Sequence, residues 1–374
     1  MNSLVSIAIT SYNYGRYLSD AIDSALNQTY PNVEVIVVDD GSTDNSRELI
    51  ASYGDRITSI LKDNAGQGSG FNTGFAASSG QIVLFLDSDD VLLPTIAERV
   101  VAIFSEPEVV KVHWPLFVID REGKLTGDVK EPMLPEGDFR EWVRREGPMT
   151  EATLPSAPTS GNAYARVFLE QVMPMPEQDY RISPDAYLFG LAPAAGKIRR
   201  FVEPQGFWRF HGANASKKSI FEQKLTNGVN DFRHQVKALR AYYERRGISF
   251  ETSNWGHEAW WPRMDQSLRQ ILSFVPEGER FVLIDGDAWG CDRVVFGRQR
   301  LHFMERNGMY WGPPDNEGNA IAEVERLRSE GLKILAIVWP AFWWLSHYHE
   351  FAKHLRSCYA CPVCNEDVIL FDLK

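Results

Sequence analysis

Cysteine is scarce in this sequence, and long apolar runs are missing. Four cysteines occur among 374 residues: Cys358, Cys361 and Cys364 lie close together, and Cys291 is isolated. This pattern is not the disulfide framework of a secreted protein. No apolar run approaches the roughly 20 residues that span a bilayer, and the start, MNSLVSIAIT, lacks the basic region of a signal peptide. We therefore expect a cytoplasmic protein.

Clusters of basic residues are missing as well. The chain has 39 Lys and Arg against 50 Asp and Glu, a formal net charge of −11, and its short basic pairs are scattered. Nucleic-acid binding draws its affinity from clustered Lys and Arg. We therefore expect no nucleic-acid partner.

The overall composition, with 44% hydrophobic and 24% charged residues, is typical of an ordinary folded protein. The length exceeds what one hydrophobic core usually serves, so more than one domain is expected. We place the first domain at residues 1–216, a helical linker at 217–275 and a smaller α/β domain at 276–374.

Strand and helix patterns alternate through the N-terminal quarter of the chain. Apolar, strand-like runs occupy residues 5–10, 33–40, 57–63 and 81–87, with helical patterns between them. The alternation predicts an α/β fold whose mostly parallel sheet carries helices on both faces. A second alternation runs from FVLIDGD near 281 to VILFDL at 368–373, and it has no Gly-rich phosphate loop.

Three polar motifs directly follow N-terminal strands: SYN at 11–13, DDGS at 39–42 and DSDD at 87–90. The carboxyl ends of parallel strands meet at one edge of a sheet, where ligands gather. Carboxylates this close together repel one another and resist burial unless a cation neutralises them. A hard divalent ion that also takes substrate phosphate oxygens suits such a cluster. We therefore expect Mg²⁺ or Mn²⁺ and a nucleotide at this edge.

Residues 5–94 resemble the nucleotide-binding half of family-2 glycosyltransferases of the GT-A fold. The motifs SYNYGRYL, VVDDGSTDNS, DNAGQGSGFNTGF and VLFLDSDDVLLP follow one another in that family's order, and the likeness extends more weakly to about residue 216. The resemblance implies an inverting enzyme that transfers a sugar from a nucleotide diphosphate, with UDP favoured, to an acceptor hydroxyl. It implies a part in the synthesis of surface glycan, polysaccharide or glycoconjugate, with a glycan, lipid-linked or protein acceptor.

The resemblance also assigns residues to the donor site. Thr10, Tyr12 and Asn13 match the loop that holds the base, and Asp40 matches the aspartate that accepts a hydrogen bond from it. Asp39 either contacts the ligand or caps the following turn.

A further set of residues with small or amide side chains matches the family's loop and helix near the nucleotide and diphosphate. These residues are Asn64, Gly66, Gln67, Asn72 and Gly74. Many relatives carry an arginine just before that second asparagine, where this chain has Phe71. One cationic contact to the donor is therefore missing.

The acidic motif matches the part of the family site that holds ribose and metal. By resemblance, Asp87 holds a ribose hydroxyl, with Ser88 beside it at the donor, and Asp89 holds the metal. Three roles stay open for Asp90: a metal ligand, a support behind the ligands, or a cap for the following helix.

The segment FWRFHGANAS (207–216) matches another family motif. The resemblance places His211 near the metal or the diphosphate, and Arg209 where its charge can neutralise phosphate.

Inversion by one displacement needs a carboxylate that removes the proton of the acceptor hydroxyl. The residue that matches the family's base is Asp185 in SPDAYLFGLAPAAG, and Asp179 is the alternative. Asp185 and Ser183 also suit a helix N-cap.

The turn PTSGNAYAR (158–166) resembles a small-residue turn that lies beside the donor sugar and the acceptor in the family. There Gly161 permits close approach and Asn162 forms a hydrogen bond. An ordinary glycine turn is the other interpretation.

Two C-terminal features lie outside the resemblance. Cys358, Cys361 and Cys364 have the spacing of zinc and iron–sulfur sites, and they equally suit packing as small apolar groups. The aromatic run WPAFWWLSHYHEF (339–351) is typical of a core or a subunit interface, which would make a homo-oligomer. A peripheral contact at the inner face of a membrane is the other interpretation of this run.

Two other functions fit part of the sequence. A nucleotidyltransferase shares metal-bound carboxylates on an α/β sheet, but it usually has a basic, Gly-rich phosphate loop that SYNYGR resembles poorly. A non-catalytic module that binds nucleotide sugars is the second alternative. The joint presence of Asp89, Asp185 and His211 favours an enzyme.

Overall fold

The computed structural model describes residues 3–148, 155–212, 220–290, 292–306 and 309–374. The chain divides into two compact units, one formed by residues 1–217 and 231–259 and the other by 218–230 and 260–374. The segment 217–275, predicted as a linker, is therefore divided between the units. The long helix α8 (Phe221–Arg246) contributes its first residues to the second unit and the rest to the first unit.

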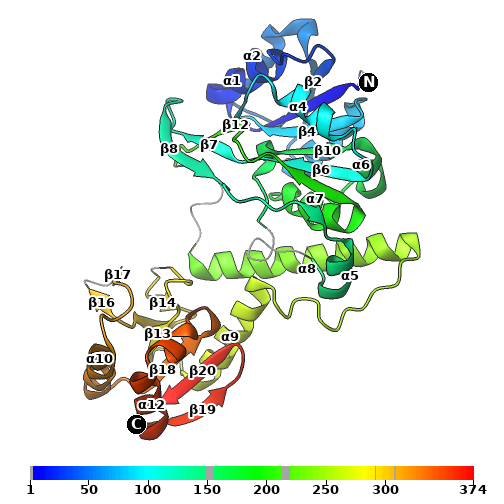
Figure 1. Cartoon of the computed structure of the whole chain (residues 1–374). Helices are drawn as coiled ribbons and strands as arrows, with labels where there is room; N and C mark the ends of the chain where they lie inside the picture. The colour runs from blue at the N-terminus through cyan, green and yellow to red at the C-terminus, as the bar shows by residue number, and fades with distance from the viewer. Residues whose placement is uncertain (1–2, 149–154, 213–219, 291, 307–308) are drawn as a thin grey trace. The chain divides into compact units, whose positions relative to one another are not determined.

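Eight strands form the main sheet of the first unit, in the order β3-β2-β1-β4-β10-β6-β11-β9 (Figure 1). Strands β1, β2, β3 and β4 pair in parallel, as do β6 and β11, whereas β10 and β9 run antiparallel to their neighbours. The strand bounds are β1 (Val5–Ser11), β2 (Val33–Asp40), β3 (Thr58–Lys62), β4 (Ile82–Asp87), β6 (Val109–His113), β9 (Gly137–Asp138), β10 (Asn162–Ala165) and β11 (Lys197–Arg200). The predicted mostly parallel α/β sheet is confirmed.

Helices cover both faces of this sheet because its strands are apolar on both sides. In β1, Val5, Ile7 and Ile9 join the core formed with α1 (Gly15–Leu26), α2 (Ser46–Ser52) and α4 (Ile96–Ile103). Ala8 points to the other face and joins the core formed with α3 (Gln67–Ala77), α6 (Arg166–Val172), α7 (Pro184–Ala195) and α8. Three short elements complete the unit: α5 (Arg140–Glu146) and the 3₁₀ turns η1 (Gly54–Arg56) and η2 (Thr159–Gly161).

A small second sheet in this unit brings two distant segments together. Its order is β5 (Val91–Leu92), β12 (Gly206–Arg209), β7 (Leu116–Ile119) and β8 (Leu125–Lys130). Strand β5 pairs with β12 in antiparallel register, with Val91 opposite Phe207. The chain just before β5 is the DSDD motif, and the chain at the end of β12 leads to His211. The pairing therefore brings these two predicted site segments to the same place.

The second unit has a six-stranded sheet in the order β14-β15-β13-β18-β20-β19. Strand β13 pairs in parallel with β15 and β18, while β14, β20 and β19 pair in antiparallel fashion. Its strands are β13 (Arg280–Ile284), β14 (Val294–Val295), β15 (Arg298–His302), β18 (Ile334–Val338), β19 (Ala360–Cys364) and β20 (Val368–Asp372), beside the hairpin β16 (Glu305–Arg306) and β17 (Met309–Tyr310). This unit therefore has the α/β pattern expected of the C-terminal residues, although it begins before the predicted boundary at residue 276.

The helices of this unit are α9 (Trp260–Phe274), α10 (Glu317–Ser329), α11 (Trp343–His347) and α12 (His349–Cys358), with a 3₁₀ turn η4 (Trp339–Ala341). The aromatic run 339–351 lies across η4, α11 and the start of α12. Within this run Trp344 is fully buried in the core, whereas Trp343 is exposed. None of the described helices is long and apolar enough to cross a membrane.

Candidate active site

The carboxyl ends of β1, β2 and β4 meet at one edge of the main sheet. Thr10 pairs with Asp87 of β4, and Ser11 pairs with Asp39 of β2, so the motifs SYN, DDGS and DSDD adjoin one another. Helix α3 comes close to this edge because Gly70 has no side chain, and a Cβ there would lie 3.0 Å from Thr10 Cγ2. The polar motifs therefore share one site.

Three aspartates crowd together where β4 ends: Asp87 is its last residue, and Asp89 and Asp90 follow. Burial raises the pKa of Asp87 well above its usual range, and the charges of Asp89 and Asp185 raise it further. Burial also raises the pKa of Asp90, with Asp89 and Asp87 adding to the rise. Ser88 is buried in the same turn. Since these carboxylates destabilise one another when ionised, a cation bound here would be strongly favoured.

His211 lies beside Asp89, with its Nε2 2.9 Å from Oδ2 of the aspartate. Burial raises the pKa of Asp89, and the hydrogen bond and the charge of His211 oppose that rise. The imidazole stacks on Tyr17, with 5.3 Å between ring centres, and meets Tyr14 edge-on at 5.7 Å. The two tyrosines therefore fix the plane of the His211 ring against Asp89.

The donor atoms at this edge suit a divalent ion that takes two ligands from the protein. In the described ranges, no three His, Cys, Asp or Glu side chains are grouped so that they could hold a metal by themselves. Asp89 and His211 offer one carboxylate and one imidazole. Mg²⁺ is commonly bound by one or two carboxylates, with waters and substrate phosphates completing its shell, and Mn²⁺ prefers similar ligands. The residues present therefore fit an ion that is shared with a diphosphate.

Asp90 is buried, and its carboxylate is hydrogen-bonded inside the protein. Its side chain is 1% exposed, and both of its oxygens accept hydrogen bonds inside the protein. Ser160 Oγ donates to Oδ2 at 2.6 Å, and the backbone N–H of Arg209 donates to Oδ1 at 2.9 Å. Of the three roles left open by the sequence, these contacts favour that of a support behind the ligands.

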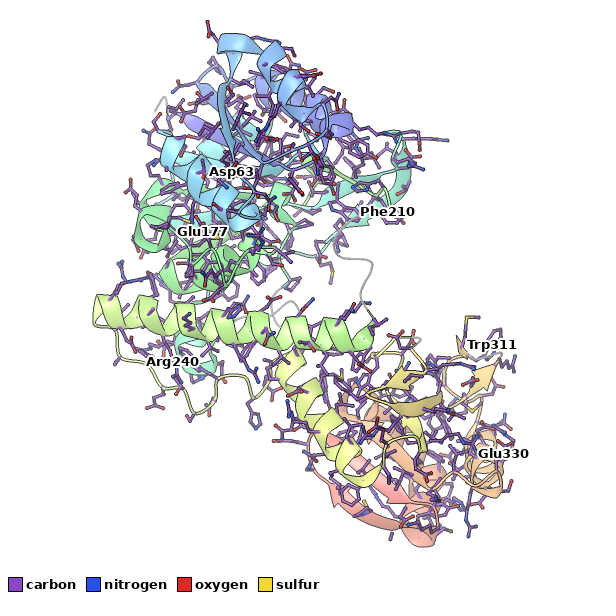
Figure 2. The ribbon with its side chains drawn as sticks, turned by 180° about the vertical axis from the view of Figure 1, so that it is seen from behind. Asp63, Glu177, Phe210, Arg240, Trp311 and Glu330 are labelled. Atoms are coloured by element: carbon purple, nitrogen blue, oxygen red, sulfur yellow. The ribbon has the colours of Figure 1, made fainter. Side chains whose placement is uncertain are left out.

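The guanidinium of Arg209 is hydrogen-bonded inside the protein. Its side chain is 3% exposed. Nε donates to the carbonyl of Asp89 at 2.9 Å, and Nη2 donates to Asp20 Oδ2 of α1 at 2.7 Å. Figure 2 labels Phe210, the residue between Arg209 and His211. The guanidinium therefore fastens the DSDD turn to α1, and its contact with a phosphate stays a prediction.

The two aspartates that end β2 have different hydrogen-bond partners. Asp40 accepts hydrogen bonds from Lys62 Nζ at 2.5 Å, from the Ala65 N–H at 3.0 Å and from the Gly66 N–H at 2.7 Å. Asp39 Oδ1 accepts from the Ser42 N–H and from Arg47 Nε, whereas its Oδ2 is buried without a partner among the described residues. Asp40 therefore holds the loop after β3, and the aspartate with a spare acceptor is Asp39.

The SYN loop is locked to the DDGS loop through Asn13. Its N–H donates to Ser42 Oγ at 2.8 Å, and its side-chain Oδ1 accepts from the Thr43 N–H at 2.7 Å. Thr10 is buried in β1, whereas Tyr12 is 48% exposed. Asn13 thus has a structural role, while the Tyr12 ring is free to meet a ligand.

Most of the residues predicted around α3 also maintain the framework. Asn64 Nδ2 donates to the carbonyl of Asp40, and Asn72 Nδ2 donates to Glu177 Oε1, both at about 3 Å. Glu177 is labelled in Figure 2. Gly66 is required because a Cβ would lie 2.3 Å from Arg181 Cγ.

Gln67 and Phe71, on the same helix, have clear positions. Gln67 Nε2 donates to Asp87 Oδ1 at 2.7 Å and so reaches the acidic cluster. Phe71 is 1% exposed and stacks on Phe85, with 4.1 Å between ring centres. The position that is an arginine in many relatives is therefore part of the core in this chain.

Gly161 and Asn162 shape the turn that supports the acidic cluster. A Cβ on Gly161 would lie 2.6 Å from Ala157 Cβ and 2.8 Å from the Trp114 carbonyl. Asn162 Nδ2 donates to the carbonyls of Ala157 and Pro158 at 3.0 and 2.7 Å. These contacts favour the interpretation of an ordinary, tightly packed glycine turn.

Asp185 stands in the first turn of α7, after the N-cap Ser183. Its Oδ1 accepts a hydrogen bond from the N–H of Ala186 at 3.0 Å. Its charge reaches Asp87, because it raises the pKa of that residue. Asp179, the alternative base, is paired with Lys237 Nζ at 2.8 Å. The electrostatic contact with the acidic cluster favours Asp185 over Asp179.

Sequence reasoning missed Tyr14, Tyr17 and Ser160. Burial raises the pKa of Tyr14 to about 12, and the nearby charges of Asp89 and Asp87 contribute. Ser160 Oγ bridges the cluster, since it also accepts from the N–H of Asp87 at 3.1 Å. The sequence could have indicated that Tyr14 and Tyr17 point the same way, because they are three residues apart at the start of α1, and residues three apart in a helix share a face.

The C-terminal cysteines do not form a metal site in the described parts of the chain. Cys358, Cys361 and Cys364 are all exposed. Neither they nor nearby histidines gather into a metal-holding group. Cys291 and the end of the predicted motif, residues 213–216, lie outside the described residues.

Residues 6–153 match the model of Glycosyl transferase family 2. Over 326 residues the chain is 37% identical to an uncharacterized glycosyltransferase of Nostoc sp., and this match covers 81% of the chain and 93% of the relative. The chain belongs to glycosyltransferase family 2. Membership confirms the predicted enzyme class and the GT-A-like fold of the first unit.

This glycosyltransferase matches other relatives over shorter spans. It is 45% identical over 103 residues to an uncharacterized glycosyltransferase of Rickettsia prowazekii, which covers 28% of this chain and 32% of that protein. It is 35% identical over 102 residues to the glycosyltransferase GlyG of Streptococcus pneumoniae, covering 26% of this chain and 34% of GlyG.

Similar solved structures include TarS 1–349 of S. aureus in complex with UDP-GlcNAc, with a TM-score of 0.44 and 18% identity over 70% of this chain and 78% of that one. The mannosyltransferase PcManGT of Pyrobaculum calidifontis, in complex with GDP-Man and Mn²⁺, gives a TM-score of 0.42 and 18% identity over 65% and 67% of the two chains.

Proposed function

We propose that this glycosyltransferase moves a sugar from a nucleotide diphosphate to an acceptor hydroxyl by a single inverting displacement, with the help of a divalent ion. One observation carries the proposal: Asp89 and His211 adjoin each other in a cluster with Asp87, and the charge of Asp185 reaches that same cluster. Groups suited to a leaving diphosphate and to an acceptor base are therefore close together. Inversion requires this closeness, because attack and departure occur in one step on opposite faces of the sugar carbon.

The donor would bind along the edge formed by β1, β2 and β4. Tyr12 offers an exposed aromatic face for stacking of the base. We assign the hydrogen bond with the base to Asp39 Oδ2, the acceptor without a protein partner, in place of Asp40. We assign a ribose hydroxyl to Asp87, which Gln67 orients from α3.

Asp89 and His211 would hold the divalent ion, Mg²⁺ or Mn²⁺, which supplies positive charge to the departing diphosphate when bound. The protein fixes both ligands from behind. Arg209 holds the carbonyl of Asp89, while Tyr14 and Tyr17 hold the ring of His211. Asp90 ties the β5 turn to β12.

Asp185 would accept the proton of the acceptor hydroxyl as that oxygen attacks. Its place in the first turn of α7 stabilises its ionised form, because helix N-termini favour negative charge. We favour a UDP-sugar as donor, and a hydroxyl of a glycan, a lipid-linked molecule or a protein as acceptor.

A product assay tests this function. The full chain is incubated with UDP-, GDP- and dTDP-sugars, with and without Mn²⁺, and released nucleotide is measured; slow hydrolysis of the donor needs no acceptor. We expect release of a nucleoside diphosphate that depends on the ion. Release of pyrophosphate from a nucleoside triphosphate and a sugar phosphate would instead support a nucleotidyltransferase, and binding without any turnover would support a non-catalytic module.

A further inference from the structure

Lys111 is a lysine buried in the middle of the main sheet. It belongs to β6, is 2% exposed, and donates a hydrogen bond from Nζ to Ser156 Oγ at 2.7 Å. A buried ammonium lowers stability unless neighbouring groups stabilise its charge. An apolar side chain of similar length would fill this place without that cost. The charge at this position therefore calls for an explanation.

Lys111 lies on the face of the sheet that carries Asp185. It stands directly opposite Tyr164 of β10, and directly opposed residues share a face. Tyr164 packs in the same core as Tyr187 and Leu188 of α7. Asp185 opens this helix. The lysine in the strand and the aspartate at the helix start are therefore on the same side of the sheet.

The charges of Lys111 and Asp185 act on each other. Burial lowers the pKa of Lys111 to about 7, and the charge of Asp185 opposes that fall. Burial raises the pKa of Asp185, while its backbone contacts and the charge of Lys111 lower it. Burial raises the pKa of Tyr164, the residue opposite Lys111, and the charge of Asp185 adds to the rise. The geometric basis of these effects is that α7, which carries Asp185 in its first turn, packs against β6, the strand of Lys111.

The other titratable groups around the pair do not supply the positive charge that Lys111 supplies. Asp231 of α8 raises the pKa of Asp185, and Asp87 of β4 is a second carboxylate within electrostatic range. His113 of β6 has its pKa lowered to about 3 by burial and by the charge of Lys111, so its ring is neutral at pH 7. These neighbours are negative or neutral at pH 7, so they do not oppose the rise in the pKa of Asp185, whereas the charge of Lys111 does.

We propose that Lys111 is the cationic partner of Asp185, a positioning residue that keeps the proposed base ionised in its buried surroundings. The inference rests on the proposed role of Asp185 and adds a residue that acts through it. An ionised Asp185 can accept the acceptor proton, whereas a protonated one cannot. Lys111 therefore sets the acidic limit of the pH range in which transfer proceeds.

The test is the pH profile of kcat/KM for donor turnover by the full chain and by Lys111→Met. Without Lys111, the pKa of Asp185 rises, so we expect the acidic limb to move upward by about one pH unit, with activity recovering at higher pH. Lys111→Gln should shift the limb in the same direction, and Lys111→Arg should return it toward the wild-type position. A merely structural role would lower activity at every pH and leave the limb in place.

Lys197→Met is the matched control. Lys197 belongs to β11 of the same sheet and pairs with Glu108 at 3.2 Å, with its side chain 31% exposed. Its removal should leave the limb unchanged. Thermal unfolding accompanies each variant, and Lys111→Met should unfold at a temperature no lower than wild type, because apolar replacement of a buried charge is often neutral or stabilising.

Two outcomes separate this inference from the proposed function. If Asp185→Asn abolishes transfer but Lys111→Met and Lys111→Gln keep the wild-type limb, Lys111 is not the partner of the base and the proposed function stands. If Asp185→Asn transfers sugar at the wild-type rate, the base assignment and the inference drawn from it are both overturned.

Discussion

The Nε2 atom of His211 lies 2.9 Å from Oδ2 of Asp89, and the two side chains are only 5% and 14% exposed. The antiparallel pairing of β5 with β12 produces this contact, because it aligns the residues after DSDD with those before His211. A carboxylate and an imidazole held this closely suit the proposed two-ligand site, which waters and phosphate oxygens would complete. This pair is the structural basis of the proposed metal dependence.

Replacing either member of this pair should remove ion-dependent turnover. We expect Asp89→Asn and His211→Gln each to lower kcat/KM by about 100-fold or more, because each removes charge stabilisation of the leaving group. The double variant should lose little more than either single variant, since the two residues act as a unit. The control is His257→Gln, an exposed histidine of the first unit, which should behave as wild type. Independent, additive losses in the double variant would contradict a shared ion.

Asp40→Asn should destabilise the fold. Its carboxylate accepts three hydrogen bonds, one from Lys62 at the end of β3 and two from the loop that follows, and an amide can satisfy them only in part. We expect a loss of about 1–3 kcal/mol in the free energy of unfolding, measured by urea denaturation at pH 7. Asp63→Asn, an exposed neighbour labelled in Figure 2, should cost little. Full stability combined with weakened nucleotide binding would restore Asp40 as the residue that contacts the base.

Gly161→Ala should also destabilise the fold. The added methyl group would lie 2.6 Å from Ala157 Cβ and 2.8 Å from the Trp114 carbonyl, so the turn must shift. Overpacking of this kind typically costs about 1–3 kcal/mol, which thermal unfolding will detect. A variant of normal stability with weakened acceptor binding would show that the glycine serves a ligand.

Glu34 should contribute stability that depends on pH. Burial would raise its pKa, but hydrogen bonds from Ser6, Ser79 and Gly80 outweigh burial and lower it. A carboxyl whose pKa is lower in the folded state stabilises the protein above its unfolded pKa of about 4.3 and loses that effect as pH falls through the folded value. Glu34→Gln should therefore be less stable than wild type at pH 7, and the difference should shrink below about pH 4. An equal difference at pH 7 and at low pH would contradict this account.

The main elements of the fold follow from local patterns in the sequence. The strands near 5–10, 33–40 and 81–87 are visible because uninterrupted apolar runs suit a sheet that is buried on both faces. The sequence pattern over 342–357 predicts a single helix, but the structure has two, α11 and α12, which meet at Tyr348, where φ is −101° and ψ is 79°. Apolar aromatic residues occur on most sides of this predicted helix, so the hydrophobic periodicity alone does not reveal where α11 ends and α12 begins.

The site residues could be predicted as a group, but their individual contacts could not. Asp39 and Asp40 are adjacent and chemically identical, and their partners come from α2 and from the loop after β3, which the tertiary fold brings in. Arg209 is drawn inward by Asp20 of α1, a residue with no motif around it. Lys111 was not selected because one lysine in an apolar strand has no distinctive spacing. Which hydrogen bonds each of these side chains forms depends on segments that are distant in the sequence, and only the packing of those segments determines it.

Calorimetric titration of the wild-type chain with UDP, GDP and dTDP, with and without Mn²⁺, tests the central claim most directly. We predict that one of these nucleotides binds tightly only in the presence of the ion, and that Asp89→Asn abolishes this dependence. Binding of equal strength with and without Mn²⁺, or no binding of any of the three, would contradict the claim that Asp89 and His211 hold an ion for a nucleotide diphosphate.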